Sequence, residues 1–425
     1  MTSTTKTLTL AQCRALARAA FESDGERFGI ECEWPTRPRG DRSARSDYTT
    51  LSQIAKVAPR GGSNVSLEPG GQLELSSAAF DSPGACFAAL RADEAWLHAR
   101  IEEHGLEWGP ESLDETRLPE LVLPYDRYHA MAAYWDAGGP AGRWMMTNTT
   151  SIQLNISNDP TDAELRWQVT NVIGPVLVAM FANSGGEDAT GARWESLRQG
   201  IWASMHPCRT APVRLDIPGP EAWLEYALNA DVFLIRTRGT HAGRGLAPGF
   251  TFAEWMANGH ELGWPTAEDF AYHLTTLFPP VRPKGWLELR MLDSLPPRMR
   301  TAAALTVAIA TRTGVAREVL AAMPYTACLW RSAARRGLHD ARLRHAAEAL
   351  VAIVLAHTDA VEAGAEDFEA LRQYFADFTL RGFSPSMLHR MHLPAPLVTE
   401  SFDERLTGQT IPQSLAAARQ SALRP

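Results

Sequence analysis

The sequence has few cysteines, and their spacing forms no recognised site. It contains 5 Cys in 425 residues, an odd number, and no Cys-x-x-Cys pair. This pattern fits reduced thiols better than a disulfide framework or a zinc site. We expect Cys13, Cys32, Cys86 and Cys328 to be small core residues.

Long apolar runs and long basic runs are also missing. The most apolar stretches, around 301–311 and 349–356, are too short to span a bilayer. The Thr-rich first ten residues lack a basic region followed by an apolar one. Lys and Arg number 41 against 49 Asp and Glu, a net charge of −8, which argues against nucleic acid as a partner. We therefore expect a cytoplasmic protein that binds neither membranes nor nucleic acids; its oligomeric state stays open.

The usual nucleotide-binding motifs and internal repeats are absent from the sequence. There is no G-x-x-x-x-G-K-[ST] and no G-x-G-x-x-G, so nothing supports a P-loop or a dinucleotide-binding fold. No fixed-period repeat indicates a solenoid or a propeller. With 45% hydrophobic and 21% charged residues, the composition is that of an ordinary globular protein.

The hydrophobic pattern predicts an α+β protein. Between 28 and 156, short alternating segments are interleaved with helices such as 83–104, which Gly105 can end. A second helix follows Asn158-Asp159-Pro160 and is closed by 183–186. Beyond Arg298 the sequence is rich in Ala, Leu and Arg with helical spacing, over 302–320, 340–356 and 367–378. We predict a single domain over 1–425 with a helical region from about 298 onward.

Polar side chains alternate with core residues in four segments. Glu31 and Glu33 share one strand face, opposite Ile30, Cys32 and Trp34. In the second segment, Glu68 precedes a Pro-Gly-Gly turn, and the strand after the turn carries Gln72, Glu74 and Ser76 on its polar face. The polar face of the third segment carries Gln153 and Asn155, and that of the fourth carries Glu288 and Arg290. An isolated E-x-E would best fit a solvated edge strand, but here four such segments occur together.

If these strands form one sheet, its polar face holds five carboxylates, two amides and one guanidinium. Five carboxylates this close together repel one another, so positive charge is needed to stabilise them. Oxygen ligands suit magnesium, which keeps other positions for water and substrate phosphates. The face therefore indicates nucleotide-dependent phosphoryl chemistry.

Two arginines lie near aromatic residues in the second half of the chain. Arg198 and Arg209 flank Trp202, and the guanidinium fork suits a carboxylate or a phosphate. The alternative to a ligand role is that both arginines lie on the surface, with their side chains over Trp194 and Trp202. Arg282 and Lys284 precede the Glu288 strand and could meet phosphate, although Lys284 could equally be solvated. We interpret His273 as a structural residue.

Several segments together match a known family. They are 29–33, 67–76, Met145-Met146 with 151–155, 181–184, 196–198 with 201–202, and 272–293. On these motifs the chain, from about Phe28 to Ser386, resembles the plant-type glutamate-cysteine ligase family. It is most similar to the actinobacterial branch that supplies γ-glutamylcysteine for ergothioneine synthesis. His206, Ala211 and Ser157 are departures, since the family often has Asp, Gly and Asp there, and they affect the local loops and the amine site.

The resemblance implies a cupped, mostly antiparallel sheet flanked by helices, similar to the catalytic part of glutamine synthetase, with ATP and more than one Mg²⁺ at the acidic face. The expected metal ligands are Glu31, Glu33, Glu68, Glu74 and Glu288. The expected substrate or ATP ligands are Gln153, Asn155, Arg198, Arg209, Trp202, Arg282 and Arg290. Glu288, Arg198 and Arg209 are the expected catalytic residues.

The resemblance also implies a reaction in two steps. The γ-carboxylate of glutamate takes the γ-phosphoryl group of ATP, and the cysteine amine then displaces phosphate from the acyl phosphate. Two alternatives stay open: a γ-glutamyl ligase for another amine, and a homologue that binds ligands but has lost its activity.

Overall fold

The computed structural model describes residues 8–237 and 242–390. Its centre is a six-stranded sheet in which every neighbouring pair is antiparallel. In spatial order the strands are β11 (Val281–Pro283), β12 (Leu287–Asp293), β6 (Ser151–Ile156), β1 (Phe28–Trp34), β4 (Leu73–Ser76) and β3 (Asn64–Leu67). All four segments with alternating polar residues therefore belong to one sheet, which is the condition on which the expected acidic face depends.

The register of the sheet places the polar residues opposite one another. Glu33 pairs with Glu74 across β1 and β4, and Glu31 pairs with Gln153 across β1 and β6. Glu288 lies opposite Asn155 on β6. Because side chains on directly paired residues point to the same face, these groups gather on one side of the sheet.

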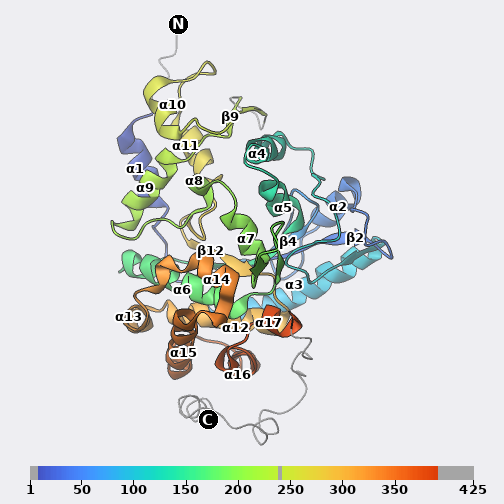
Figure 1. The fold of residues 1–425 in the computed structure, drawn as a ribbon, viewed down its shortest axis with the longest axis vertical. Coiled ribbons are helices and arrows are strands. Elements are labelled where there is room, and N and C mark those ends of the chain that lie inside the picture. The colour runs from blue at the N-terminus through green and yellow to red at the C-terminus, as the bar shows by residue number, and fades with distance from the viewer. Residues whose placement is uncertain (1–7, 238–241, 391–425) are drawn as a thin grey trace, which may run out of the picture.

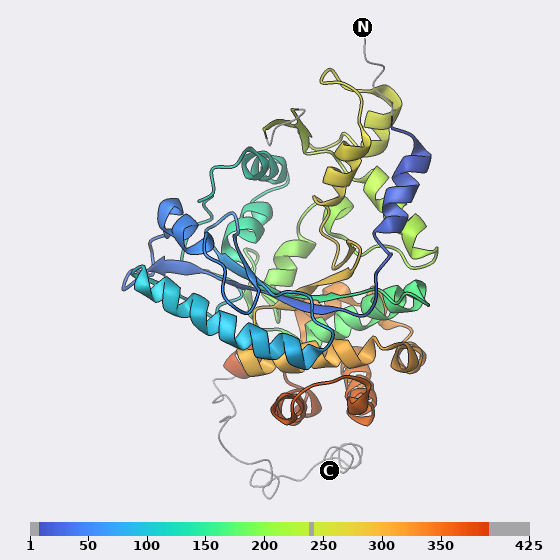
Figure 2. The same ribbon diagram turned by 180° about the vertical axis from the view of Figure 1, so that it is seen from behind.

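Helices cover the other, apolar side. Figure 2 shows α3 (Pro83–Glu103) and α12 (Pro297–Ala310) lying across the sheet, with α6 (Ala163–Phe181) beside them. The first of these confirms the helix predicted for 83–104, and Gly105, at φ +74°, follows its end. The core joins residues from Leu8 to Leu388 in one cluster, and the single domain stays our proposal.

The region after 298 is helical, as expected. It holds α13 (Thr313–Ala322), α14 (Trp330–Arg336), α15 (Ala341–Ala356), α16 (Ala365–Asp377) and α17 (Pro385–Arg390). The helix predicted for 302–320 is two helices, because Arg312 adopts an extended backbone (φ −64°, ψ 135°) between α12 and α13. The Arg312 side chain donates to the Ala360 carbonyl oxygen at 3.1 Å and pairs with Glu26 at 3.3 Å, so tertiary contacts stabilise the break.

A third group of helices stands over the polar face of the sheet (Figure 1). It comprises α4 (Asp126–Asp136), α5 (Ala141–Asn148), α7 (Leu197–Ala203) and α8 (Pro207–Thr210). Beyond it lie α1 (Leu10–Ala19), α9 (Gly219–Asn229), α10 (Phe252–Asn258) and α11 (Ala267–Leu274). The remaining elements are α2 (Tyr48–Ala55), β2 (Thr36–Pro38) with β5 (Leu106–Trp108), β7 (Gly186–Glu187) with β8 (Arg193–Trp194), and β9 (Leu234–Arg236) with β10 (Gly243–Gly245). The predicted α+β class is confirmed.

The cysteines follow the prediction with one exception. All five are free, and Cys13, Cys32 and Cys86 are buried. Cys328 is exposed, so its predicted place in the core is wrong: it ends a 3₁₀ turn, Thr326–Cys328, that follows α13 and has no regular apolar face to bury. Within the described ranges, the helices are too short or too polar to cross a bilayer.

Candidate active site

A cavity of about 310 Å³ opens on the polar face of the sheet. Ten of the predicted site residues line it: Glu31, Glu33, Glu68, Glu74, Gln153, Arg198, Trp202, Arg282, Glu288 and Arg290. Asn155 and Arg209 do not line this cavity. The fold thus brings together acids from β1, β4 and β12 and the turn before β4, and faces them with cations from β11, β12 and α7.

Glu33 is held in place by three hydrogen bonds. Its carboxylate accepts hydrogen bonds from the Ser151 backbone N–H at 2.9 Å, the Ser151 hydroxyl at 3.1 Å and the Gln153 amide at 2.9 Å. These donors orient the carboxylate, yet burial still raises the pKa of Glu33 against the opposing charge of Arg198.

Glu68 is positioned by the Pro69-Gly70-Gly71 turn. Gly71 has φ +85°, a conformation that side chains other than glycine's rarely adopt, and its N–H donates to the Glu68 carbonyl oxygen at 2.8 Å. A Cβ on Gly70 would lie 2.2 Å from the carbonyl oxygen of Thr147. The two glycines therefore allow the turn to form and to approach α5 closely.

The acids lack enough positive charge among their neighbours. Burial raises the pKa of Glu31 to about 7, with help from Glu288 and Glu74. Burial, followed by the charges of Glu74 and Glu33, raises the pKa of Glu68 well above its usual range. The pKa of Glu74 is raised by burial and by Glu33. A divalent cation would remove this mutual repulsion.

The donor set fits magnesium. All the acidic groups offer carboxylate oxygen, the ligand type that Mg²⁺ prefers. In the part of the chain that the structure describes, the only three His, Cys, Asp or Glu side chains whose ligand atoms lie within 4.8 Å of one another are His206, Cys208 and Asp231. No three glutamate carboxylates of the wall lie that close together among the described residues, so a magnesium ion here would take only some of its ligands from the protein.

Opposite the acids, Glu288 binds three cations. Its Oε1 accepts from Arg282 at 3.0 Å and Lys284 at 2.9 Å, and its Oε2 accepts from Arg282 at 2.6 Å and Arg290 at 2.8 Å. Burial opposes ionisation of this side chain, but the charges of Arg282, Arg290 and Lys284 outweigh it and hold the pKa of Glu288 well below its usual range. The metal role of Glu288 stays a prediction, because both of its oxygens already accept from cations here.

Arg290 links the cation group to the amide strand, and Arg198 approaches from α7. Arg290 donates to the Gln153 amide oxygen at 2.5 Å. Arg198 is buried and donates to the carbonyl oxygens of Leu292 and Arg290, both at 3.1 Å. Its Nε is buried and has no partner among the described residues. The surface-arginine alternative is therefore wrong for Arg198, which lines the cavity.

Arg209 occupies a different environment. It is fully buried and donates to the Thr276 carbonyl oxygen at 2.6 Å, to the Thr276 hydroxyl at 2.9 Å, and to the Asp231 carbonyl oxygen. The rings of Tyr134 and Phe233 lie against its guanidinium. The surface-arginine alternative is therefore wrong for Arg209 too. Because Arg209 does not line the cavity, its predicted role as a ligand of substrate or ATP stays a prediction. His273, interpreted as structural, is buried and bonds the Ala227 carbonyl oxygen at 2.9 Å.

Asn155 lies at a neighbouring cavity of about 460 Å³, which shares Glu31 with the first. Its amide donates to Glu31 at 3.0 Å, and its oxygen accepts from the Trp286 indole N–H at 2.8 Å. Trp286 lines this second cavity and carries Lys284 over its ring at 4.9 Å. Sequence reasoning missed Trp286, and it also missed Tyr128 on the wall of the first cavity.

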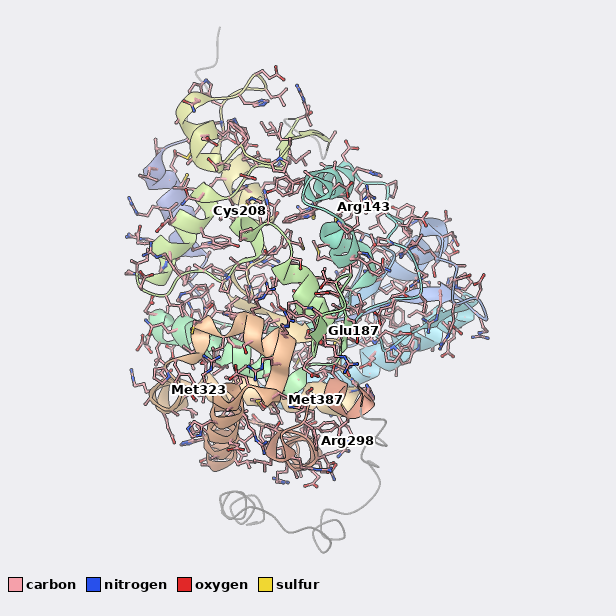
Figure 3. The ribbon with its side chains drawn as sticks, viewed as in Figure 1. Arg143, Glu187, Cys208, Arg298, Met323 and Met387 are labelled. Atoms are coloured by element: carbon pink, nitrogen blue, oxygen red, sulfur yellow. The ribbon has the colours of Figure 1, made fainter. Side chains whose placement is uncertain are left out.

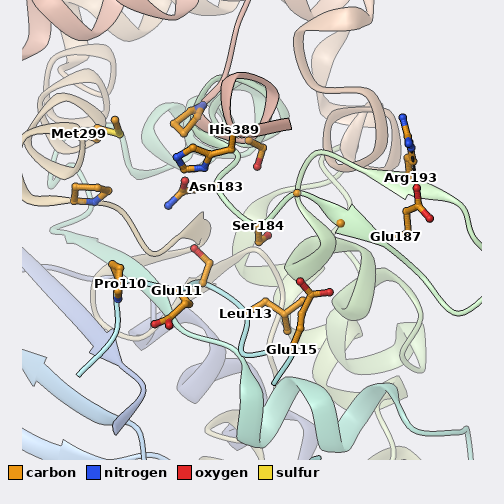
Figure 4. A pocket seen from close by; sticks show the side chains of 16 residues that line it. Pro110, Glu111, Leu113, Glu115, Asn183, Ser184, Glu187, Arg193, Met299 and His389 are labelled. Atoms are coloured by element: carbon orange, nitrogen blue, oxygen red, sulfur yellow. Dashed lines mark hydrogen bonds and ion pairs between the residues drawn. The ribbon is translucent and has the colours of Figure 1, made fainter. Parts of the chain in front are cut away.

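A third cavity, of about 780 Å³, lies apart from the acidic face (Figure 4). It is bordered by Glu111, Glu115 and Asn183 and by the ion pair of Arg193 with Glu187 at 2.8 Å. None of the predicted site residues lines it. Although it is larger, it lacks the facing groups of acids and cations, so we take the 310 Å³ cavity as the candidate active site.

Comparisons with known proteins identify the family. Residues 27–386 match the model of glutamate-cysteine ligase family 2. The chain is 39% identical over 335 residues to the glutamate–cysteine ligase EgtA of Mycolicibacterium smegmatis, covering 76% of this chain and 78% of the relative. It is 35% identical over 339 residues to EgtA of Mycobacterium tuberculosis, covering 77% and 78%.

One solved structure shows the same fold. It is a glutamate–cysteine ligase of Francisella tularensis in complex with AMP, with a TM-score of 0.53 over 95% of this chain and 93% of that chain. The sequences are 14% identical, so this likeness concerns the fold alone.

Proposed function

The chain belongs to glutamate-cysteine ligase family 2, and from this premise we propose that it joins the γ-carboxylate of glutamate to the amino group of cysteine at the expense of ATP. The products are γ-glutamylcysteine, ADP and phosphate. The likeness to the EgtA proteins supports a place in ergothioneine synthesis. The observation that carries the proposal is the cavity in which four glutamates face Arg282, Lys284 and Arg290.

The acidic wall is the proposed metal site. Glu31, Glu33, Glu68 and Glu74 would hold Mg²⁺ and leave some of its coordination positions to water and phosphate oxygens. When bound, magnesium screens the charge of the phosphoryl group that is transferred. The raised pKa values of Glu31, Glu33, Glu68 and Glu74 support this assignment, because they mark unmet demand for positive charge.

The cationic wall is the proposed anion site. Glu288 holds Arg282, Lys284 and Arg290 in one group, and such fixed donors stabilise charge without reorganisation during the reaction. The unpartnered Nε of Arg198 offers a further donor to a carboxylate or phosphate. We propose that Arg209 positions Phe278 on the cavity wall. The carbonyl oxygen of Arg209 accepts a hydrogen bond from the Phe278 N–H at 2.7 Å, and Phe278 lines the cavity.

The second cavity is the proposed place of the nucleotide base. Trp286 offers a partly exposed ring there, and Glu31 borders both cavities, so phosphates that extend from this cavity would reach the acidic wall. The chemistry follows in two steps. A γ-carboxylate oxygen of glutamate bonds to the γ-phosphorus as the bond from that phosphorus to ADP breaks. The cysteine nitrogen then bonds to the acyl carbon as phosphate leaves, and the departing phosphate takes the proton that the amine loses.

An acceptor screen tests the proposal. The purified protein is given ATP, Mg²⁺ and glutamate with cysteine or with other amines, and ADP release is followed. We expect release that depends on glutamate and is fastest with cysteine. A faster reaction with another amine would make the protein a different γ-glutamyl ligase, and no release with any amine would make it a binding protein. Glu74→Gln should abolish the activity, whereas Glu187→Gln, in the exposed pair with Arg193, should not.

A further inference from the structure

Three potential metal ligands meet outside the candidate active site. His206, Cys208 and Asp231 place one ligand atom each within 4.8 Å of the others. The Nδ1 of His206 lies 2.9 Å from the Sγ of Cys208. Two of these residues belong to α8 or its N-cap, and Asp231 follows α9. Figure 3 shows Cys208 in the upper half of the molecule, and none of the three lines the 310 Å³ cavity.

The buried Asp231 carboxylate is held in place by its neighbours. Its Oδ2 accepts from the Tyr134 hydroxyl at 2.8 Å and from the Gly249 N–H at 3.0 Å. Among the described residues these hydrogen bonds fall on Oδ2, so Oδ1 can serve another ligand. Carboxylates that bind metals are commonly fixed by such outer hydrogen bonds. The Tyr134 hydroxyl also lies 3.7 Å from the Cys208 sulfur.

The donor chemistry of this cluster differs from that of the acidic wall. An imidazole nitrogen, a thiolate sulfur and a carboxylate oxygen suit zinc, whereas magnesium prefers oxygen alone. A thiolate and a carboxylate together carry the charge that balances one divalent ion. His206 is exposed and Cys208 is partly buried, so solvent can supply a fourth ligand.

A second observation lies beside the cluster. The Tyr226 hydroxyl on α9 is buried and has no hydrogen-bond partner in the described ranges. Burial raises its pKa, and the neighbouring Cys208 side chain adds to the shift. A buried hydroxyl without a partner is costly, and a water ligand of a bound ion is a candidate partner for it.

We propose that His206, Cys208 and Asp231 bind one zinc ion, with water as the fourth ligand. The ion would join α8 to the segment after α9 and so fix the region that contains Arg209, whose guanidinium bonds the Asp231 carbonyl oxygen. This site is separate from the proposed magnesium site and requires no ATP or glutamate. It also gives a role to His206, one of the positions at which the chain departs from the family pattern.

Cobalt substitution tests the site without reference to activity. The chelator-treated protein is titrated with Co²⁺ and its absorption is recorded, since a thiolate ligand adds a charge-transfer band in the near ultraviolet. Zn²⁺ affinity and stoichiometry are then measured by competition with a chromophoric chelator. We expect one zinc ion per chain and a thiolate band that Zn²⁺ removes. Because no substrate is present, failure here is distinguishable from failure of the proposed ligase function.

Matched variants identify the ligands. Cys208→Ser should abolish the thiolate band, and His206→Gln, at an exposed position, should weaken Zn²⁺ binding at least tenfold without harming the fold. Tyr134→Phe, which removes an outer hydrogen bond, should weaken it by about 10- to 100-fold. Cys328→Ser and His357→Gln change an exposed cysteine and a half-buried histidine elsewhere and should have no effect on Zn²⁺ binding. A wild-type protein without the thiolate band, or a band that survives Cys208→Ser, would overturn the proposal.

Discussion

Replacing Glu288 by glutamine removes the one negative charge that three cations share. The side chain is 1% exposed and contacts Arg282, Lys284 and Arg290 at 2.6 to 2.9 Å. Removing one partner of a buried ion pair costs about 3 to 5 kcal/mol, chiefly because the remaining charge stays buried without compensation. We therefore expect Glu288→Gln to lower the free energy of unfolding by about 3 kcal/mol or more, and turnover by about a hundredfold or more.

Chemical denaturation with a matched control measures this effect. Glu187 forms an ion pair with Arg193 at 2.8 Å, but the two side chains are 53% and 70% exposed. Exposed pairs contribute about 0.2 to 1 kcal/mol, so Glu187→Gln should be close to neutral. The two variants make the same chemical change at similar distances and differ in burial. Equal effects on the free energy of unfolding would refute the role that we assign to Glu288 as the anchor of the cations.

Three further predictions concern the acidic wall and its support. The pKa of Glu31 is raised from 4.5 to about 7, so the metal-free protein should lose up to about 3 kcal/mol of stability as pH rises from 4.5 through 7. The increase in melting temperature caused by Mg²⁺ should therefore grow over this pH range. In Glu31→Gln this increase should depend less on pH. Arg198→Lys keeps the charge but loses the planar fork, so the affinity for glutamate or ATP should fall by on the order of 1 to 3 kcal/mol; unchanged KM values for both would contradict this. Gly70→Ala places a Cβ 2.2 Å from the Thr147 carbonyl oxygen and should cost roughly 1 to 3 kcal/mol and weaken Mg²⁺ binding, whereas Gly314→Ala, with open space around its Cβ, should do neither.

The composition of the polar face could be predicted from the sequence. Side chains alternate strictly along a strand, so Ile30 and Cys32 in the core place Glu31 and Glu33 on the other face. The Pro-Gly-Gly turn before β4 is also local, because its positive φ requires glycine at position 71. Such features depend on neighbours in the sequence, and the structure confirms them.

Features that depend on distant contacts could not be predicted in this way. The sequence gives no sign that Glu288 lies opposite Asn155 or that Trp286 bonds the same amide, since these contacts depend on strand pairing across more than a hundred residues. Burial of Arg209 against Tyr134 depends on how α4 and α8 pack. The absence of a Cys-x-x-Cys pair likewise argued against a zinc site. The site that we propose uses a single cysteine, and its third ligand, Asp231, follows α9 and is distant in sequence from His206 and Cys208.

The central claim is that an acyl phosphate forms on this enzyme before the amine reacts. The most direct measurement omits cysteine and supplies ATP, Mg²⁺, glutamate and hydroxylamine, a small strong nucleophile that intercepts a mixed anhydride. We predict γ-glutamyl hydroxamate and ADP in equal amounts, both dependent on glutamate. AMP and pyrophosphate as products would contradict the mechanism in favour of adenylation, and neither hydroxamate nor ADP would contradict the proposed function itself.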